Sequence, residues 1–212
     1  LACLAAGPDG LGLAFLDLST GEFYIGEFPG RDALLAAAGG LAFRELLVAK
    51  SFPDPVLIRM LEAQMPSLCV NPLDAADLEP GQAQEILEKE LAASVLETSG
   101  IRNFHAAKNA AAEILRYVNA TQKIRAGHIS AVREYAPRNY LILNEAARRN
   151  LEIFATLQDG RSAGSLFALI NETLTPMGAR RLRWWLAQPL VQPEKIRGRL
   201  AAVAEIKENH AA

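Results

Sequence analysis

The sequence predicts an α/β domain followed by an all-α region, and three observations carry that prediction. Three short apolar runs fill the first thirty residues, and the turn clusters Pro8-Asp9-Gly10 and Ser19-Thr20-Gly21 separate them. Such spacing indicates a three-stranded antiparallel meander. A break follows at Pro80-Gly81, and from Phe104 onward apolar residues recur at three- and four-residue spacing. That period is typical of amphipathic helices, so the architecture changes along the chain.

Shorter elements complete the α/β domain after the meander. The brief apolar runs Val48 to Phe52 and Ser67 to Val70 predict strands. The Ala- and Leu-rich stretches Arg31 to Ala38 and Pro55 to Gln64 predict helices. Because strands and helices alternate, we predict one α/β domain over residues 1–74.

An acidic segment separates the two parts. Between Ala75 and Glu97 only Lys89 is basic, whereas six residues are acidic: Asp77, Glu79, Glu85, Glu88, Glu90 and Glu97. We therefore predict a linker and a solvated acidic helix over residues 75–103, with the domain boundary near Ala75.

Residues 104–212 are predicted to be helical. One long amphipathic helix is defined by an apolar stripe through Phe104, Ala107, Ala111, Leu115 and Val118. A short extended run is expected at 139–143. Further helical patterns cover residues 145–154, 165–171 and 177–186.

Two prolines mark helix starts near the C-terminal end. Thr175 is a predicted N-cap, and Pro176 follows at the first helical position, where its missing N–H costs no hydrogen bond. Pro193 opens the last helix in the same way. The apolar stripe of that helix needs a partner helix to cover it, and consists of Ile196, Leu200, Val203 and Ile206.

Composition places the chain among globular proteins. Of its 212 residues, 50% are hydrophobic and 22% are charged, as in folded rather than disordered chains. The net charge of -2 argues against a uniformly basic nucleic-acid binder. No apolar run approaches the ~20 residues of a membrane span.

Cys3 and Cys69 lie far apart, which favours a reducing cytosol without disulfides. Because Leu1 stands first and no basic signal start is present, we expect an excised piece of a longer protein.

Motifs for cofactor and metal chemistry are missing from the sequence. No Gly-Lys pair occurs, which excludes a phosphate-binding P-loop. His105, His128 and His210 lie in unrelated segments without a second ligand at helical spacing, which argues against zinc. We therefore predict no catalytic, cofactor-binding or metal-binding residue, and no enzymatic activity for this chain.

Asp17 is the one acidic residue for which metal binding needs to be weighed. It lies within an early strand of the meander, where nucleases with a ribonuclease-H-like fold carry a metal-binding carboxylate. A two-metal site needs several converging carboxylates, and Glu22 and Glu45 are the available candidates. Asp17 also directly precedes a Ser-Thr turn, where aspartate is a common turn former. We favour the turn, and keep the metal-dependent nuclease as the alternative.

The segment with the strongest local charge is basic and contains two tryptophans. Trp184 and Trp185 lie among six basic residues, with Glu194 as the only acid: Arg180, Arg181, Arg183, Lys195, Arg197 and Arg199. On a helix Arg180 lies over Trp184 and Arg181 over Trp185, so guanidinium stacking is possible. Arg180, Arg181, Arg183 and Arg197 are candidates for a DNA-backbone patch. The favoured interpretation is that the tryptophans anchor the helix and the arginines cover its outer face.

Four strings resemble the MutS family of mismatch-repair proteins, and they occur in that family's order. Leu11 to Phe23 (LGLAFLDLSTGEF) resembles the opening of the connector domain, and Tyr117 to Ile129 (YVNATQKIRAGHI) resembles the long helix that leads into the core. Arg148 to Glu152 (RRNLE) matches a core string. Glu172 to Leu190 (ETLTPMGARRLRWWLAQPL) resembles the most recognisable segment outside the ATPase.

The resemblance implies a fold and a role. It implies a ribonuclease-H-like connector over residues Leu1 to Leu73, without the catalytic carboxylates, followed by the first part of the helical core or lever domain. The mismatch-reading domain, the DNA clamp and the ATPase with its ATP and magnesium would lie outside this chain. Phe43-Arg44-Glu45 spells the family's mismatch wedge, but it lies in a predicted helical stretch at the wrong place, and we assign it no recognition role.

The resemblance also implies partners. The chain would link mismatch recognition to the ATPase and offer a surface to the MutL protein. Mismatched duplex DNA and MutL would be partners of a full-length, homodimeric parent in the bacterial cytosol or nucleoid. No membrane, no small-molecule substrate and no cofactor of this chain's own are expected.

Overall fold

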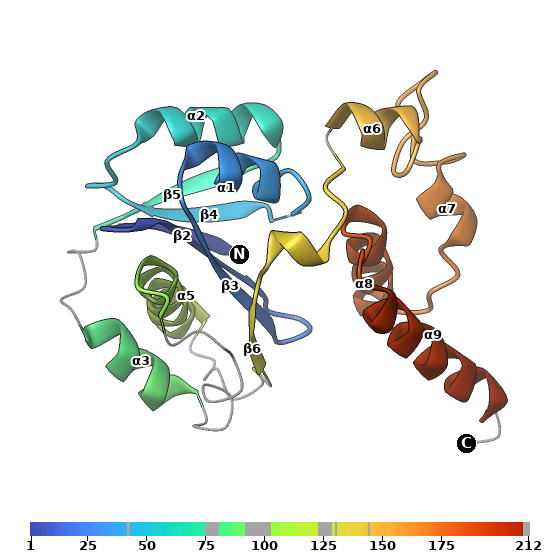
Figure 1. Ribbon diagram of the computed structural model, residues 1–212. Helices are drawn as coiled ribbons and strands as arrows, with labels where there is room; N and C mark the ends of the chain where they lie inside the picture. The colour runs from blue at the N-terminus through green and yellow to red at the C-terminus, as the bar shows by residue number, and fades with distance from the viewer. Residues whose placement is uncertain are drawn as a thin grey trace. The chain divides into compact units, whose positions relative to one another are not determined.

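A six-stranded mixed sheet organises the first of the two units into which the chain divides, Leu1–Tyr135 and Ala136–Ala212 (Figure 1). This computed structural model describes residues 1–41, 43–74, 81–91, 103–122, 129, 131–143 and 145–209. For residues 122, 131 and 145 the backbone alone is described.

The predicted meander forms the centre of the sheet. β1 (Ala2–Gly7), β2 (Gly10–Asp17) and β3 (Glu22–Phe28) are antiparallel neighbours. β4 (Glu45–Ala49) joins β1 in parallel, and β5 (Cys69–Leu73) joins β4 in parallel. The sheet order is β5-β4-β1-β2-β3-β6, so β5 and β6 are its edges.

Three predicted positions differ from the observed strands. The strand expected at Ser67 to Val70 is β5, which begins at Cys69 and ends at Leu73. The strand expected at Val48 to Phe52 is β4, which begins at Glu45 and ends at Ala49. The helical stretch expected at Phe43 to Glu45 is wrong, because Phe43 and Arg44 are not helical and Glu45 begins β4. A run of apolar residues does not define where strand pairing starts, because that depends on the neighbouring strand.

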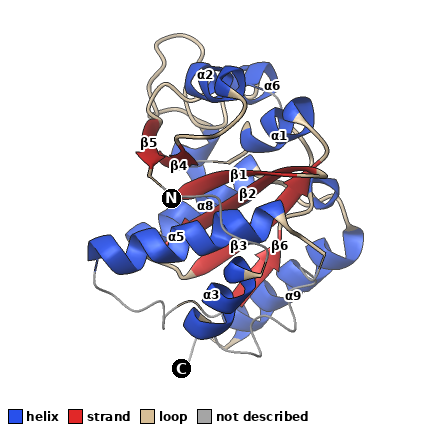
Figure 2. Ribbon diagram, turned by 90° about the vertical axis from the view of Figure 1, so that its left-hand side faces the viewer, coloured by secondary structure: helices blue, strands red, loops and turns tan. Residues whose placement is uncertain are grey.

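Helices cover both faces of the sheet (Figure 2). α1 (Arg31–Ala38) and α2 (Pro55–Gln64) lie on one face and pack against each other, with the bounds expected from the sequence. α5 (Ala106–Gln122) crosses the opposite face over β1, β2 and β3, and α3 (Gln82–Glu90) packs against α5. The first unit is therefore a three-layer α/β/α domain.

Small residues let α5 lie very close to the sheet. A Cβ added at Gly12 of β2 would lie 2.1 Å from the carbonyl carbon of Ala106, at the first turn of α5. Ala107, Ala110 and Ala111 are completely buried in this contact. Larger side chains at these positions would push the helix away from the strands, so the layer spacing depends on glycine and alanine.

The domain boundary expected near Ala75 differs from the structure. α3 and α5 belong to the first unit, and β6 (Ala131–Glu134) extends its sheet beside β3. The helix expected within 75–103 exists as α3, but its Ala83 and Leu87 are buried rather than solvated. An apolar stripe shows that a helix face becomes buried without showing whether a sheet or another helix covers it.

The second unit is helical, as expected, but the helix expected over residues 145–154 ends at Asn150. Its elements are η2 (Pro137–Asn139), α6 (Glu145–Asn150), α7 (Leu166–Ile170), α8 (Pro176–Ala187) and α9 (Pro193–Glu208). The predicted N-cap is confirmed, because the Thr175 hydroxyl accepts a 3.0 Å hydrogen bond from the Gly178 amide with Pro176 between them.

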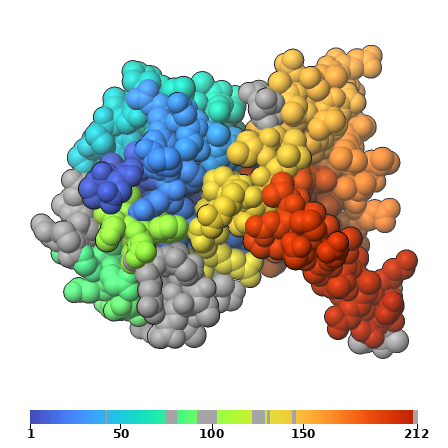
Figure 3. All heavy atoms as spheres, in the orientation of Figure 1, coloured from blue at the N-terminus to red at the C-terminus, as the bar shows by residue number. Residues whose placement is uncertain are grey.

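The last helix carries the apolar stripe that the sequence predicts, and this stripe is exposed rather than covered by another described helix. Ile196, Leu200, Val203 and Ile206 are 38%, 62%, 50% and 68% exposed. Every residue from Ala201 to Asn209 is exposed, alanines included. Figure 3 shows α9, coloured red, reaching beyond the other helices of its unit.

Candidate functional site

Two arginines lie against one tryptophan where α8 meets α9. The guanidinium carbon of Arg199 is 4.3 Å from the centre of the Trp185 ring, and that of Arg181 is 5.6 Å away. The Arg181 contact confirms the stack predicted from the four-residue spacing. Cation–π contacts of this kind are worth roughly 0.5 to 2 kcal/mol each, depending on desolvation. Trp185 is therefore the anchor that joins the two helices.

A third arginine packs on phenylalanines instead. The Arg183 guanidinium lies 4.1 Å from the centre of the Phe154 ring and 5.6 Å from that of Phe167. The two rings are themselves 6.1 Å apart in a tilted arrangement. Arg183 thereby ties α8 to α7 and to the turn that follows α6. Trp184 packs edge-to-face against Tyr140, with ring centres 6.4 Å apart.

The candidate arginines Arg181 and Arg183 point to different sides of α8. Residues two apart on a helix point about 200° from each other, which separates Arg181 from Arg183. The same spacing separates the exposed Arg197 from Arg199, which lies on Trp185. Arg180 is also exposed. Of the four candidates, Arg181 and Arg183 thus contact aromatic rings, and Arg180, Arg183 and Arg197 are exposed.

Asp17 forms the turn between β2 and β3. Its Oδ1 accepts hydrogen bonds from the Ser19 amide at 2.8 Å, from the Ser19 hydroxyl and from the Thr20 amide at 3.3 Å. This confirms the interpretation as a turn former. Within the described parts of the chain, no three His, Cys, Asp or Glu side chains are grouped as a metal site would need.

Glu45, another of the candidate carboxylates, links three elements. Its Oε1 accepts 2.7 Å and 2.6 Å hydrogen bonds from the Tyr117 hydroxyl of α5 and from the side-chain amide of Asn71 in β5. The bond to Glu45 raises the pKa of the Tyr117 phenol above its ordinary value. No local sequence signal predicts this link, because Glu45 and Tyr117 are 72 residues apart.

A serine string missed by the sequence reasoning lies in the second unit. Gly160 to Gly164 (GRSAG) has the G-x-S-x-G spacing of a hydrolase nucleophile elbow. An elbow needs a strand before the serine and a helix after it. Here turns and bends precede Ser162, and Gly160 and Gly164 have φ values of +66° and +94°. The string therefore lacks the strand-turn-helix geometry of that motif.

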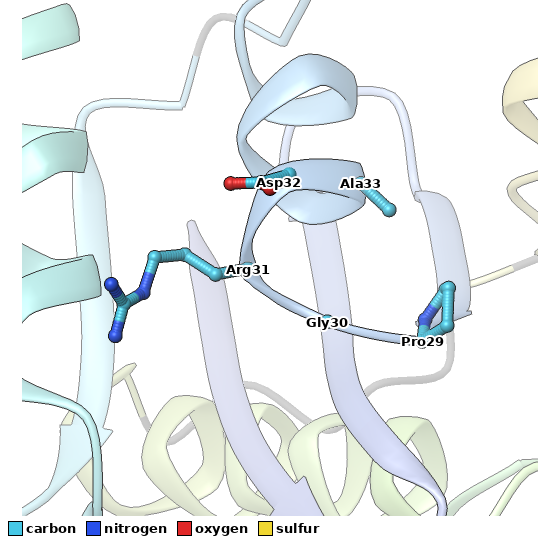
Figure 4. A pocket seen from close by; sticks show the side chains of 5 residues that line it. All are labelled: Pro29, Gly30, Arg31, Asp32 and Ala33. Atoms are coloured by element: carbon cyan, nitrogen blue, oxygen red, sulfur yellow. The ribbon is translucent and has the colours of Figure 1, made fainter.

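A shallow hollow lies at the start of α1 and is lined by residues 29–33 (Figure 4). The Arg31 side chain leaves it and makes two 2.9 Å bonds to the Asp54 carboxylate, at the N-cap of α2. Arg31 is the main reason that the pKa of Asp54 is lowered. The charged groups here therefore hold α1 to α2.

None of the helices in the described ranges is long and apolar enough to cross a membrane.

Comparisons with known proteins agree with this two-part architecture. A family model described as MutS domain II matches residues 1–130, and one described as MutS domain III matches residues 146–212. A DNA mismatch repair protein MutS of Syntrophomonas wolfei is 33% identical over 223 residues, covering 98% of this chain and 24% of that protein. The Myxococcus xanthus protein of the same name is 35% identical over 207 residues, covering 97% and 23%. The chain spans about a quarter of the length of these relatives.

Proposed function

This chain belongs to the MutS family of DNA mismatch repair proteins, and we propose that it is a non-catalytic connector and core segment. In that role it links mismatch recognition to the ATPase and offers a surface to MutL. The observation that carries the proposal is the direct succession of the two domains. A sheet domain matched to domain II is followed, after β6, by a helical unit matched to domain III.

The topology supports a ribonuclease-H-like fold for the connector. Three antiparallel strands are continued by β4 and β5 in parallel, with helices on both faces. The nuclease alternative receives no support from Asp17, because its carboxylate is engaged in the β2–β3 turn. We therefore propose a structural rather than catalytic use of this fold.

The arginine-rich helices are proposed as scaffold. Arg181, Arg183 and Arg199 lie on aromatic rings of the second unit, where they join helices. Arg180, Arg183 and Arg197 are exposed, and Arg180 and Arg197 are the two through which the alternative, contact with a DNA backbone, is testable. Phosphate contacts release counterions, so such binding weakens steeply with salt. Loss of salt-dependent duplex binding in Arg180→Ala/Arg197→Ala would favour the alternative, and unchanged binding would support the scaffold.

The cofactors and partners are proposed only on the basis of membership in the MutS family. ATP and magnesium are expected to act in the ATPase domain of a full-length parent, with no cofactor held by these residues. Mismatched duplex DNA, MutL and a second copy of the parent are the proposed partners. Three measurements on the purified chain test these assignments.

The first measurement is calorimetric titration with MutL from the same organism. The other two are ATP turnover and magnesium-dependent cleavage of duplex DNA. We expect MutL binding without turnover or cleavage. ATP hydrolysis by the pure chain would contradict the proposal. Cleavage that disappears in Asp17→Asn would replace it with the nuclease alternative.

A further inference from the structure

One donor in the second unit is buried without an acceptor. The indole Nε1 of Trp185 is shielded from solvent, and no described residue accepts a hydrogen bond from it. The residue as a whole is only partly buried. Buried polar groups in folded proteins are nearly always hydrogen-bonded, because an unpaired donor has lost its bond to water without replacing it. This N–H is therefore a group for which an acceptor is expected.

Two positive charges lie on the same ring. The guanidinium carbons of Arg199 in α9 and Arg181 in α8 are 4.3 Å and 5.6 Å from the centre of the Trp185 ring. A guanidinium over a ring acts through its charge, while its N–H donors lie in its own plane. Both arginines are partly exposed, so their side chains can shift to admit a small group. Three donor groups, two of them charged, are thus gathered around one ring.

The surrounding sequence adds to the positive charge. From residue 176 to residue 199, six residues are basic, and Glu194 is the only acid. Such an excess attracts an anion more strongly than a neutral acceptor. A neutral carbonyl would satisfy the indole N–H alone. An anion would satisfy the N–H and also balance guanidinium charge, so the expected acceptor is an anion.

A carboxylate matches these donors better than a phosphate. Its two oxygens lie in one plane and accept from a guanidinium edge in parallel. Each oxygen has two lone pairs, so one of them can accept from the indole N–H as well. A phosphate brings a larger charge and further oxygens, each of which needs a donor or water. The edge of a partly buried ring suits the smaller, flat group.

We propose that Trp185, Arg181 and Arg199 form a binding site for the carboxylate of an acidic side chain. The guanidinium groups attract and orient the carboxylate, and the indole N–H gains its acceptor once the atoms that cover it are displaced. The bound group contacts residues of both α8 and α9. This binding goes beyond the proposed linking role and needs neither DNA nor ATP. Its failure and a failed MutL titration are therefore separate results.

Acetate is the probe, and the indole N–H signals in NMR spectra of the chain are the readout. The chain has two tryptophans, and Trp184→Phe identifies the signal of each. We expect the Trp185 signal to move downfield and to saturate, with half of the change at about 10 to 50 mM acetate, because single ion pairs near a surface are weak. Sodium chloride at equal ionic strength controls for screening. Trp184, whose ring packs on Tyr140, is the internal reference and should stay in place.

Two arginines of α9 provide a matched pair of variants. Arg199→Gln removes the guanidinium nearest to the Trp185 ring, whereas Arg197→Gln removes the same charge from an exposed position two residues away. Arg199→Gln should weaken acetate binding at least about fivefold and Arg197→Gln less than about twofold, because a distant, exposed charge is screened more. Equal weakening by the two changes would overturn the site, since it would show general attraction alone.

Three further results would also overturn the proposal. They are a Trp185 signal that moves no more in acetate than in chloride, equal movement of both tryptophan signals, and tighter binding of inorganic phosphate than of acetate. The Trp184 signal also reports whether Arg199→Gln preserves the fold of the unit. If it does not, Arg181→Gln takes its place, with the same weakening expected.

Discussion

Tyr117 of α5 donates a 2.7 Å hydrogen bond to Glu45 of β4 and thereby fastens the long helix to the parallel half of the sheet. Tyr117→Phe keeps the ring and removes this bond. We expect the free energy of unfolding to fall by about 1 kcal/mol, since a hydrogen bond of this kind contributes roughly 0.5 to 1.5 kcal/mol. Urea denaturation at pH 7 measures the change. An equal loss in Tyr24→Phe, whose hydroxyl makes a longer 3.4 Å bond to Glu22, would show that the Tyr117 bond is not special.

The pair Tyr117 and Glu45 also predicts that the free energy of unfolding depends on pH in the alkaline range. The pKa of Tyr117 is raised in the folded chain, chiefly by its bond to Glu45. Because the pKa is raised, the protonated phenol stabilises the fold at pH values below the phenol pKa of the unfolded chain, about 10. This contribution disappears as the pH rises through the pKa of the phenol in the folded chain. The stability advantage of the wild type over Tyr117→Phe should therefore shrink above pH ~10. A constant difference from pH 7 to pH 11 would contradict the prediction.

Gly12 is expected to be intolerant of any side chain. The Cβ in Gly12→Ala would lie 2.1 to 2.4 Å from backbone atoms of Ala106 and Ala107, which cannot rotate away. Overpacking of this kind costs about 1 to 3 kcal/mol or more, so the midpoint of thermal unfolding should drop by several degrees. Gly198→Ala is the control, because its Cβ meets nothing within 4 Å and lies inside α9. That change should be neutral or stabilise α9.

Arg183 should not be replaceable by lysine. Its guanidinium lies over Phe154 and Phe167, and an ammonium group has no flat face to stack on either ring. We expect Arg183→Lys to reduce the stability of the second unit by about 1 kcal/mol. Arg197→Lys, at an exposed position of α9, should change it by less than about 0.5 kcal/mol. Equal effects of the two substitutions in urea denaturation would argue against the stacked role.

The distal half of α9 should exchange its amide protons quickly. Residues 201–209 are all exposed, and a single helix of this length is marginal in water without a covering surface. We expect its amides to exchange at least about 100-fold faster than those of the buried core of α5, because local opening is easiest where few contacts hold an element. Protection equal to that of α5, measured at low protein concentration, would contradict the prediction.

The sequence by itself determined the elements whose signals are local. The helices at Arg31–Ala38 and Pro55–Gln64, the Asp17 turn and the Thr175 cap all follow from residues within one or two turns of each other. Four strings in family order also predicted the family, which the matches to domains II and III confirm.

Only the tertiary structure decided which surfaces meet. The stripe of α5 was correctly expected to be buried, but the structure shows that a sheet covers it and that β6 extends the first unit to Tyr135. It also divides the arginines among Trp185, Phe154 and Phe167, and it pairs Glu45 with Tyr117. Periodicity specifies that a face is apolar, whereas its partner is selected by shape and packing between segments far apart in the chain.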